Sequence, residues 1–164
     1  MANKFNTDSL KLVSGGQTGI DRAVLDFCLD HGIPCGGWCP AGRKAEDGII
    51  DEKYPLKELP EASYGKRTAA NVRDSDATVI LFPGEMVGGT LKSFEFVMKE
   101  KKPFLLLDMS VLDATTAAGR LRRFLERYAP STVNFSGPRH SQWEEGYGYC
   151  YAILQLVFGT PVRN

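Results

Sequence analysis

The stretch LVSGGQTGIDRA, residues 12–23, decides the fold of this chain. The apolar run Leu10–Val13 leads into three glycines within five residues, and a helical pattern follows at once over Thr18–His31. A strand, a tight turn and a helix N-terminus in this order direct several backbone N–H groups to one point, at the positive end of the helix dipole. The turn therefore predicts a site for phosphate or another small anion on its own residues, Gly15, Gly16, Gln17, Thr18 and Gly19. An ordinary strand-to-helix turn without a ligand is the alternative, because neither the dinucleotide fingerprint nor the P-loop pattern is matched.

The size and composition are those of one globular domain, residues 1–164, with 43% hydrophobic and 24% charged residues. Twenty basic and twenty acidic residues cancel, which argues against a dedicated surface for nucleic acid or anionic membranes. No apolar segment has the length of a membrane span, and the N-terminus lacks the apolar core of a signal peptide. We therefore expect a cytoplasmic protein that partners neither nucleic acid nor membrane.

We expect reduced thiols, the default in a cytosolic protein, and the spacing of the cysteines predicts no metal bound by protein ligands. Cys28 and Cys150 lie in apolar helical patterns and are expected in the core. Cys35 and Cys39 are separated by three residues, which is not the C-x-x-C spacing of zinc or redox sites. Only two histidines are available to complete a metal site.

Strand-like and helix-like segments alternate along the chain. The expected strands are Leu10–Ser14, Ile33–Trp38, Ala77–Phe82, Phe104–Leu107 and Thr132–Phe135. The expected helices are Thr18–His31 with Gly32 as its C-cap, Gly65–Asp74, Gly88–Lys101, Asp113 or Thr115 to Tyr128, and Gly148 or Tyr149 to Phe158. This alternation predicts an α/β fold: a Rossmann-like, three-layer α/β/α domain with a mainly parallel central sheet. Residues 39–61, rich in proline, glycine and charge, are expected to form a long loop.

Ligands of such folds bind beyond the carboxyl ends of the strands, so the loops that follow strands are expected to converge on one site. The second glycine turn, Gly88-Gly89-Thr90, opens a helix and is a second predicted phosphate site. Its threonine is expected either to act as the N-cap or to turn its hydroxyl toward the phosphate. Two glycine turns after two strands are much less expected by chance than one, which favours a ligand role for the second turn.

Four further side chains follow strands and are candidates for ligand contact. Trp38 offers a face for stacking on a planar ring, and Arg43, Lys44 and Arg139 offer positive charge to an anion. The alternatives are a packing tryptophan, solvated loop charges and a surface ion pair.

Seven motifs together resemble the molybdenum carrier family, which is related to the molybdenum-cofactor carrier proteins. They are SGGQTGIDRA at 14–23, GGWCP at 36–40, GRKAEDG at 42–48, RT at 67–68, NVRDSD at 71–76, GGT at 88–90 and GPR at 137–139. The resemblance spans about residues 10–158. It implies the Rossmann-like fold of the wider group that includes the Lonely guy phosphoribohydrolases, the lysine-decarboxylase-like proteins and DNA-processing protein A. It also implies binding of molybdenum cofactor (molybdopterin) or a related phosphorylated pterin or nucleotide-like ligand, and a tendency to oligomerise.

Two functions follow from this resemblance. The first is a non-catalytic carrier, in which the glycine turns hold phosphate while Trp38 and Arg43 line the ring side. The second is a phosphoribohydrolase acting on nucleoside monophosphates, because the related enzymes pair an arginine before a strand with a glutamate after a glycine turn. Arg67 and Glu95 are the candidates here, although Glu95 lies farther beyond the turn than in those enzymes. The binder is the favoured interpretation.

The closing segment also predicts self-association. Tyr149, Tyr151 and Leu156 cannot all share the helix face of Ile153 and Val157, and an exposed aromatic surface is typical of an interface. We therefore expect a dimer or tetramer; if residues 139–147 instead fold back over this surface, a monomer results. Sedimentation equilibrium distinguishes the two by the mass, a multiple of 18.1 kDa or that value itself.

Overall fold

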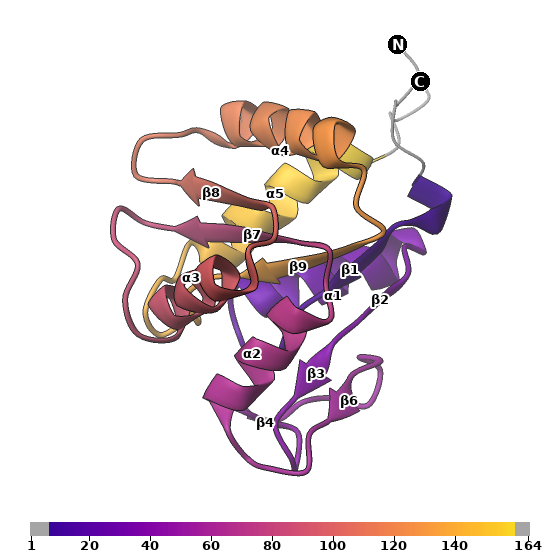
Figure 1. Cartoon of the computed structure of the whole chain (residues 1–164), viewed down its shortest axis with the longest axis vertical. Coiled ribbons are helices and arrows are strands. Elements are labelled where there is room, and N and C mark those ends of the chain that lie inside the picture. The colour runs from indigo at the N-terminus through magenta and orange to yellow at the C-terminus, as the bar shows by residue number, and fades with distance from the viewer. Residues whose placement is uncertain (1–6, 160–164) are drawn as a thin grey trace.

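The central sheet of this protein consists of five parallel strands in the order β2-β1-β9-β7-β8 (Figure 1). The computed structural model describes residues 7–159. The strands are β1 Lys11–Val13, β2 Cys35–Gly36, β7 Ala77–Phe82, β8 Phe104–Asp108 and β9 Thr132–Ser136. The last of them occupies the centre of the sheet, because Val133 lies opposite Leu12 of β1 on one side and Ala77 of β7 on the other.

Helices cover both faces of the sheet (Figure 1). Helices α1 Ile20–His31, α5 Gly146–Phe158 and α4 Ala114–Tyr128 pack side by side on one face, and α2 Tyr64–Arg73 and α3 Gly88–Glu100 pack together on the other. A short 3₁₀ turn, η1 Thr7–Ser9, precedes β1. The predicted Rossmann-like α/β/α architecture with a mainly parallel sheet is therefore confirmed.

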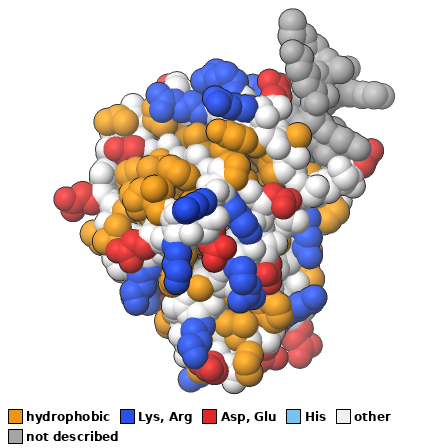
Figure 2. Space-filling model, in the orientation of Figure 1, with side chains coloured by type: hydrophobic (Ala, Val, Ile, Leu, Met, Phe, Trp, Pro, Cys, Tyr) orange, Lys and Arg blue, Asp and Glu red, His pale blue; other side chains and the backbone are white. Residues whose placement is uncertain are grey.

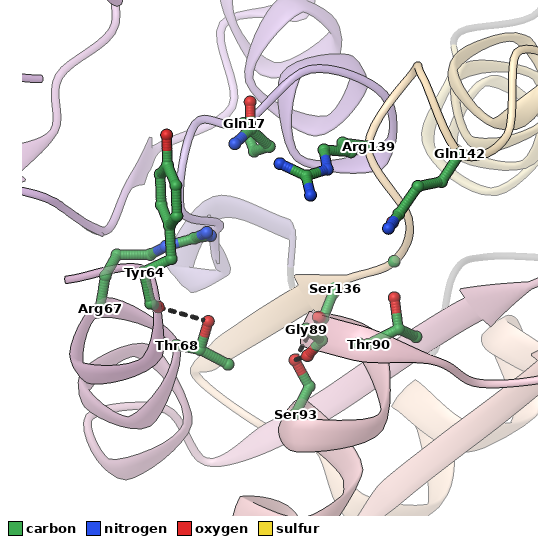
Figure 3. Close-up of a pocket in the computed structure, with 12 residues that line it drawn as sticks. Gln17, Tyr64, Arg67, Thr68, Gly89, Thr90, Ser93, Ser136, Arg139 and Gln142 are labelled. Atoms are coloured by element: carbon green, nitrogen blue, oxygen red, sulfur yellow. Dashed lines mark hydrogen bonds between the residues drawn. The ribbon is translucent and has the colours of Figure 1, made fainter. Parts of the chain in front are cut away.

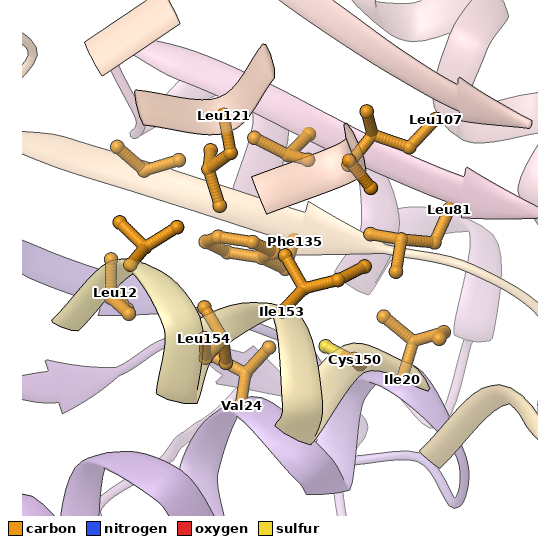
Figure 4. Packing of buried hydrophobic residues seen from close by; sticks show 14 of the residues in the cluster. Leu12, Ile20, Val24, Leu81, Leu107, Leu121, Phe135, Cys150, Ile153 and Leu154 are labelled. Carbon is orange, nitrogen blue, oxygen red and sulfur yellow. The ribbon is translucent and has the colours of Figure 1, made fainter. Parts of the chain in front are cut away.

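The main core lies between the sheet and the layer formed by α1, α4 and α5 (Figure 4). Strand β7 is buried at every position, as expected for a continuous apolar run with helices on both sides. Phe135 at the centre of the sheet packs among apolar side chains from all three helices, among them Val24, Leu121 and Ile153. Cys28 and Cys150 are buried in this core as free thiols, as predicted.

The helix ends follow the sequence signals, with two corrections. Gly32 ends α1 in the left-handed conformation, and its N–H donates to the carbonyl of Cys28. Val87, not Thr90, is the N-cap of α3, so Thr90 lies inside the first turn. Helix α5 begins at Gly146, before the predicted Gly148, because the preceding turn is closed by the N–H of Gly146 donating to the carbonyl of Trp143.

The predicted long loop at 39–61 is instead a small ordered lobe. It carries β4 Lys44–Ala45, paired with β5 Gly48–Ile49, and β6 Lys57–Glu58, paired with β3 Trp38–Cys39. The lobe has its own small core, in which Cys39, Ile50 and Tyr54 pack against Leu25 of α1. The hydroxyl of Tyr54 donates to Asp26 of α1 at 2.5 Å, so the lobe is fastened to the main domain by polar as well as apolar contacts.

The surface of α5 only partly matches the predicted self-association surface. Trp143 is buried in the main core and stacks on Tyr149, while the hydroxyl of Tyr151 donates to Asp30. Tyr149 and Leu156 remain exposed, so the homo-oligomer stays a prediction.

On the face of the molecule shown in Figure 2, basic and acidic side chains are interspersed. Within residues 7–159, no helix has the length and apolar character needed to cross a bilayer.

The packing of α4 against the sheet generates a stability prediction. Leu121 is fully buried, so Leu121→Ala is expected to lower the free energy of unfolding by about 2–5 kcal/mol. Leu29→Ala is the matched control, because this leucine of α1 is 43% exposed and its truncation is expected to cost less than about 1 kcal/mol. Urea unfolding measures both; equal losses would contradict the assignment of the core.

Candidate functional site

A pocket opens beyond the carboxyl ends of β1 and β9, between α2, α3 and the loop that follows β9 (Figure 3). Its volume is about 170 Å³. Twelve residues line it: Gln17, Tyr64, Arg67, Thr68, Gly88, Gly89, Thr90, Ser93, Ser136, Gly137, Arg139 and Gln142. The lining contains two arginines and no Asp, Glu or His, so the charge of its own side chains favours an anion.

Three of the loops predicted to converge do meet at this pocket. They contribute Gln17 after β1, Gly88-Gly89-Thr90 after β7, and Gly137 with Arg139 after β9. Sequence reasoning did not place six of the lining residues in the site: Tyr64, Thr68, Ser93, Ser136, Gly137 and Gln142. Ser136 directly ends the last strand and carried a positional signal, whereas the side chains from α2 are placed only by the packing of that helix on α3.

The amides of the first glycine turn serve an internal carboxylate. Asp21, in the first turn of α1, is 5% exposed, and its Oδ2 accepts from the backbone N–H of Gln17 at 3.3 Å. The same oxygen accepts from Nη1 of Arg67 at 2.9 Å. The side-chain carbonyl of Gln17 in turn accepts from the N–H of Thr18 and from that of Glu46. The N–H of Gln17 thus serves the protein's own aspartate, and a ligand site formed by Gly15–Gly19 stays a prediction.

The glycines of this turn are required by neighbouring protein atoms. A Cβ at Gly15 would lie 1.8 Å from Nη1 of Arg67, and one at Gly16 would lie 2.5 Å from Cδ1 of Leu56. A Cβ at Gly19 would lie 2.6 Å from the carbonyl oxygen of Pro138. Gly16 and Gly19 also adopt positive φ values of 77° and 81°. Substitution at these positions would therefore disturb the fold and is no clean test of ligand binding.

Arg67 lies across the first glycine turn, where it pairs with Asp21 and also lines the pocket. Its side chain is 12% exposed and forms the buried ion pair with Asp21. Its Nε is buried and has no hydrogen-bond partner within the part of the chain that the structure describes. Burial raises the pKa of Asp21, and the charge of Arg67 opposes that rise. Arg67 thus reaches the pocket wall with one donor already used and another still unsatisfied.

The N-terminus of α3 forms the opposite wall. Val87 supplies no side-chain cap, whereas Ser63 and Asp113 cap α2 and α4 with their side chains. Gly88 and Gly89 are exposed, so the first N–H groups of α3 and the positive end of its dipole face the open pocket. Figure 3 shows Thr90 and Ser93 on this wall.

Two serines meet beneath this wall. The hydroxyls of Ser93 and Ser136 lie 2.6 Å apart, and that of Ser93 also donates to the carbonyl of Gly89 at 3.1 Å. This chain of hydroxyls ties the end of β9 to the first turn of α3. It therefore holds the glycine turn in place without occupying its N–H groups.

A polar contact between the 39–61 lobe and the loop after β9 closes the far side of the site. Glu46 accepts from the hydroxyl of Thr18 and from the N–H and the hydroxyl of Ser141, the latter two at 3.1 and 2.6 Å. Arg139 Nε lies 3.7 Å from Glu46 Oε2. Burial acts to raise the pKa of Glu46, but the hydrogen bonds from Ser141 and Thr18 outweigh it and lower that pKa. The ionised carboxylate thus positions the loop that carries Arg139.

Eight predicted site residues lie outside the lining of this pocket: Gly15, Gly16, Thr18 and Gly19 of the first glycine turn, together with Trp38, Arg43, Lys44 and Glu95. The guanidinium of Arg43 donates to four backbone carbonyls of the lobe, those of Ile50, Asp51, Tyr54 and Leu56. Lys44 is exposed on β4, and Trp38 lines a different cavity. Glu95, the proposed acid of the hydrolase alternative, is exposed on α3, so only its predicted partner Arg67 faces the pocket. Among the described residues, no group of three or more His, Cys, Asp or Glu side chains is arranged to hold a metal ion.

Comparison with known proteins agrees with this architecture. The model of the circularly permutated YpsA SLOG family matches residues 12–158. A crystal structure from Syntrophus aciditrophicus SB, of a protein provisionally named a molybdenum carrier protein, is 40% identical in sequence. The likeness covers 90% of this chain and 94% of that one, with a TM-score of 0.89. No curated protein sequence matches the chain.

The Glu46 contact predicts a pH-dependent stability difference. Because the pKa of Glu46 is lower in the folded chain than its ordinary value, its stabilisation is complete above about pH 4.3 and is lost as the pH falls through the folded pKa. Glu46→Gln is therefore expected to lower Tm by about 2–4 °C at pH 7, with the difference closing at low pH. Glu144→Gln, an exposed acid nearby, is the control. Thermal unfolding at several pH values measures both; a difference that stays constant would contradict the assignment.

Proposed function

The chain belongs to the circularly permutated YpsA SLOG family, and on this premise we propose that it binds a small phosphorylated metabolite in the pocket between α2 and α3. In this proposal the N–H groups of Gly88 and Gly89 and the hydroxyl of Thr90 hold the phosphoryl group. Arg67 and Arg139 supply the positive charge from opposite sides.

The observation that carries the proposal is the unpartnered Nε of Arg67. A buried donor on a charged group costs free energy when it has no acceptor, so an acceptor that reaches Arg67 from the adjoining pocket would remove this cost. The uncapped N-terminus of α3 supplies further donors on the opposite wall. Both features favour an oxyanion with several acceptor atoms, and a phosphate monoester is such a group.

We propose molybdenum cofactor or a related phosphorylated pterin as the ligand class. Support comes from the name given to the 40% identical protein of Syntrophus aciditrophicus. The pocket, of about 170 Å³, accommodates the phosphoryl group and the atoms next to it. The rest of such a ligand would extend over the open rim toward Tyr64 and Gln142, which offer a ring face and an amide.

We propose that the protein carries this ligand without transforming it. The described residues that line the pocket hold no carboxylate or imidazole to act as general acid or base. The carboxylate beneath them, Asp21, is already paired with Arg67. A carrier in the cytoplasm that works as a homo-oligomer is the accompanying proposal, with the exposed Tyr149 and Leu156 as its contact surface.

The proposal predicts a specific loss of phosphate affinity. Arg139→Gln is expected to weaken binding of inorganic phosphate and AMP about 10-fold, because it removes a charged donor while the fold keeps its other contacts. Arg123→Gln on the exposed face of α4 is the matched control. Calorimetry measures the affinity, and amide shifts of Gly88, Gly89 and Thr90 locate the site.

Two outcomes would contradict the proposal. Equal affinities of the two arginine variants would place the anion elsewhere on the protein. Release of free base from AMP, lost in Glu95→Gln, would show a phosphoribohydrolase in place of a carrier.

A further inference from the structure

A second cavity lies at the other end of α2 and shares no lining residue with the phosphate pocket. Its volume is about 190 Å³. The floor is formed by β1 and β9, one wall by the C-terminal end of α2, and the other by the chain around Trp38 and Lys57. Its residues are Lys11, Val13, Gly37, Trp38, Pro55, Lys57, Asn71, Asp74, Ser75 and Thr132.

Trp38 is held in one orientation on the wall of this cavity. Its backbone N–H donates to Oδ1 of Asn71 at 2.8 Å, and its carbonyl accepts from Nδ2 of the same side chain at 3.0 Å. The indole Nε1 donates to Oδ2 of Asp74 at 2.8 Å. Because the backbone and the ring of Trp38 are both fixed, stacking of a planar ligand on the indole costs little side-chain entropy.

Two lysines give the cavity positive charge. Nζ of Lys57 lies 5.9 Å from the centre of the Trp38 ring. The ammonium of Lys11 lies close to Gly36: a Cβ atom added to this glycine would be 3.3 Å from Nζ of Lys11. Asp74 is the acidic residue of the lining, and its carboxylate already accepts from Trp38 and from Arg73. The two ammonium groups therefore remain to attract an anion.

Ser75 indicates that a hydrogen-bonding partner belongs in this cavity. The residue is 2% exposed, and its Oγ has no hydrogen-bond partner among residues 7–159. A buried hydroxyl without a partner costs free energy. An anion held by the two lysines would accept the proton of this hydroxyl and remove the cost.

We infer that this cavity is a second binding site, for a small planar anion of the aromatic carboxylate class. The ring stacks on Trp38, and the carboxylate accepts from Ser75 and lies near Lys11 and Lys57. The inference is independent of the phosphate pocket, because no residue is common to the two sites.

Titration with benzoate tests the site, with benzamide as the uncharged analogue of the same shape. The chain holds two tryptophans, so ¹⁵N spectra show the indole of Trp38 beside that of Trp143, which is buried in the main core and serves as the internal control. Benzoate is expected to shift the Trp38 indole saturably, with affinity about 10-fold above that of benzamide. Absence of a saturable shift, or equal affinities, would overturn the inference.

Two variants and one control locate the contacts. Ser75→Ala is expected to lower the affinity for benzoate about 10-fold. The Tm of the free variant is expected to equal or exceed that of wild type, because the hydroxyl has no described partner to lose. Lys57→Met is expected to weaken benzoate similarly, and Lys53→Met, in the same lobe but outside the cavity, is expected to have no effect. If Ser75→Ala binds benzoate as wild type does, or lowers Tm, the hydroxyl has a structural or water partner and the inference fails.

Inorganic phosphate separates this test from that of the proposed function. It is expected to shift the amides of Gly88–Thr90 and to leave the Trp38 indole unmoved. Benzoate shifts confined to Gly88–Thr90 would overturn the second site and leave the phosphate pocket standing. Loss of phosphate binding with an intact benzoate response would contradict the phosphate pocket and leave the second site standing.

Discussion

The buried ion pair between Asp21 and Arg67 organises the rest of the structure. It joins the first turn of α1 to α2 across the glycine turn, at 2.9 Å, with both side chains nearly excluded from solvent. Removing one partner from such a pair leaves an unpaired buried charge, which costs about 3–5 kcal/mol. The pair therefore fixes α2 on the sheet, and with it the side chains that α2 contributes to two separate cavities.

This pair also explains why the predicted anion site and the observed pocket differ. A strand followed by glycines and a helix provides convergent N–H groups, and here Asp21 satisfies the N–H of Gln17 in place of a ligand. The unfilled donors lie at the start of α3 and on Arg67. The first glycine turn thus affects the ligand site indirectly: it holds the carboxylate of Asp21, and this carboxylate orients Arg67.

The alternating pattern predicted the layers and most element ends, because apolar periodicity and turn residues such as Gly32 act locally. The order inside the 39–61 lobe could not be predicted, since it depends on distant partners, such as Arg43 donating to carbonyls up to 13 residues away. Within the pocket, Gln17, the Gly88-Gly89-Thr90 turn and Arg139 could be predicted, because each follows a strand. The places of Trp38 and Arg67 depend on contacts made by α2, with Asn71 in one case and Asp21 in the other, which local patterns do not contain.

The position of β9 at the centre of the sheet sets the order in which the chain can be assembled during synthesis. The pair β1–β2 is complete by residue 36 and the pair β7–β8 by residue 108, but among the described strands β9, which begins at Thr132, is the one that pairs with both. A ribosome-bound chain lacking this strand holds two half-sheets, each with an open edge toward the missing centre. Closure is therefore a late, long-range event, and truncation before residue 132 leaves a chain with exposed strand edges of the kind that aggregate.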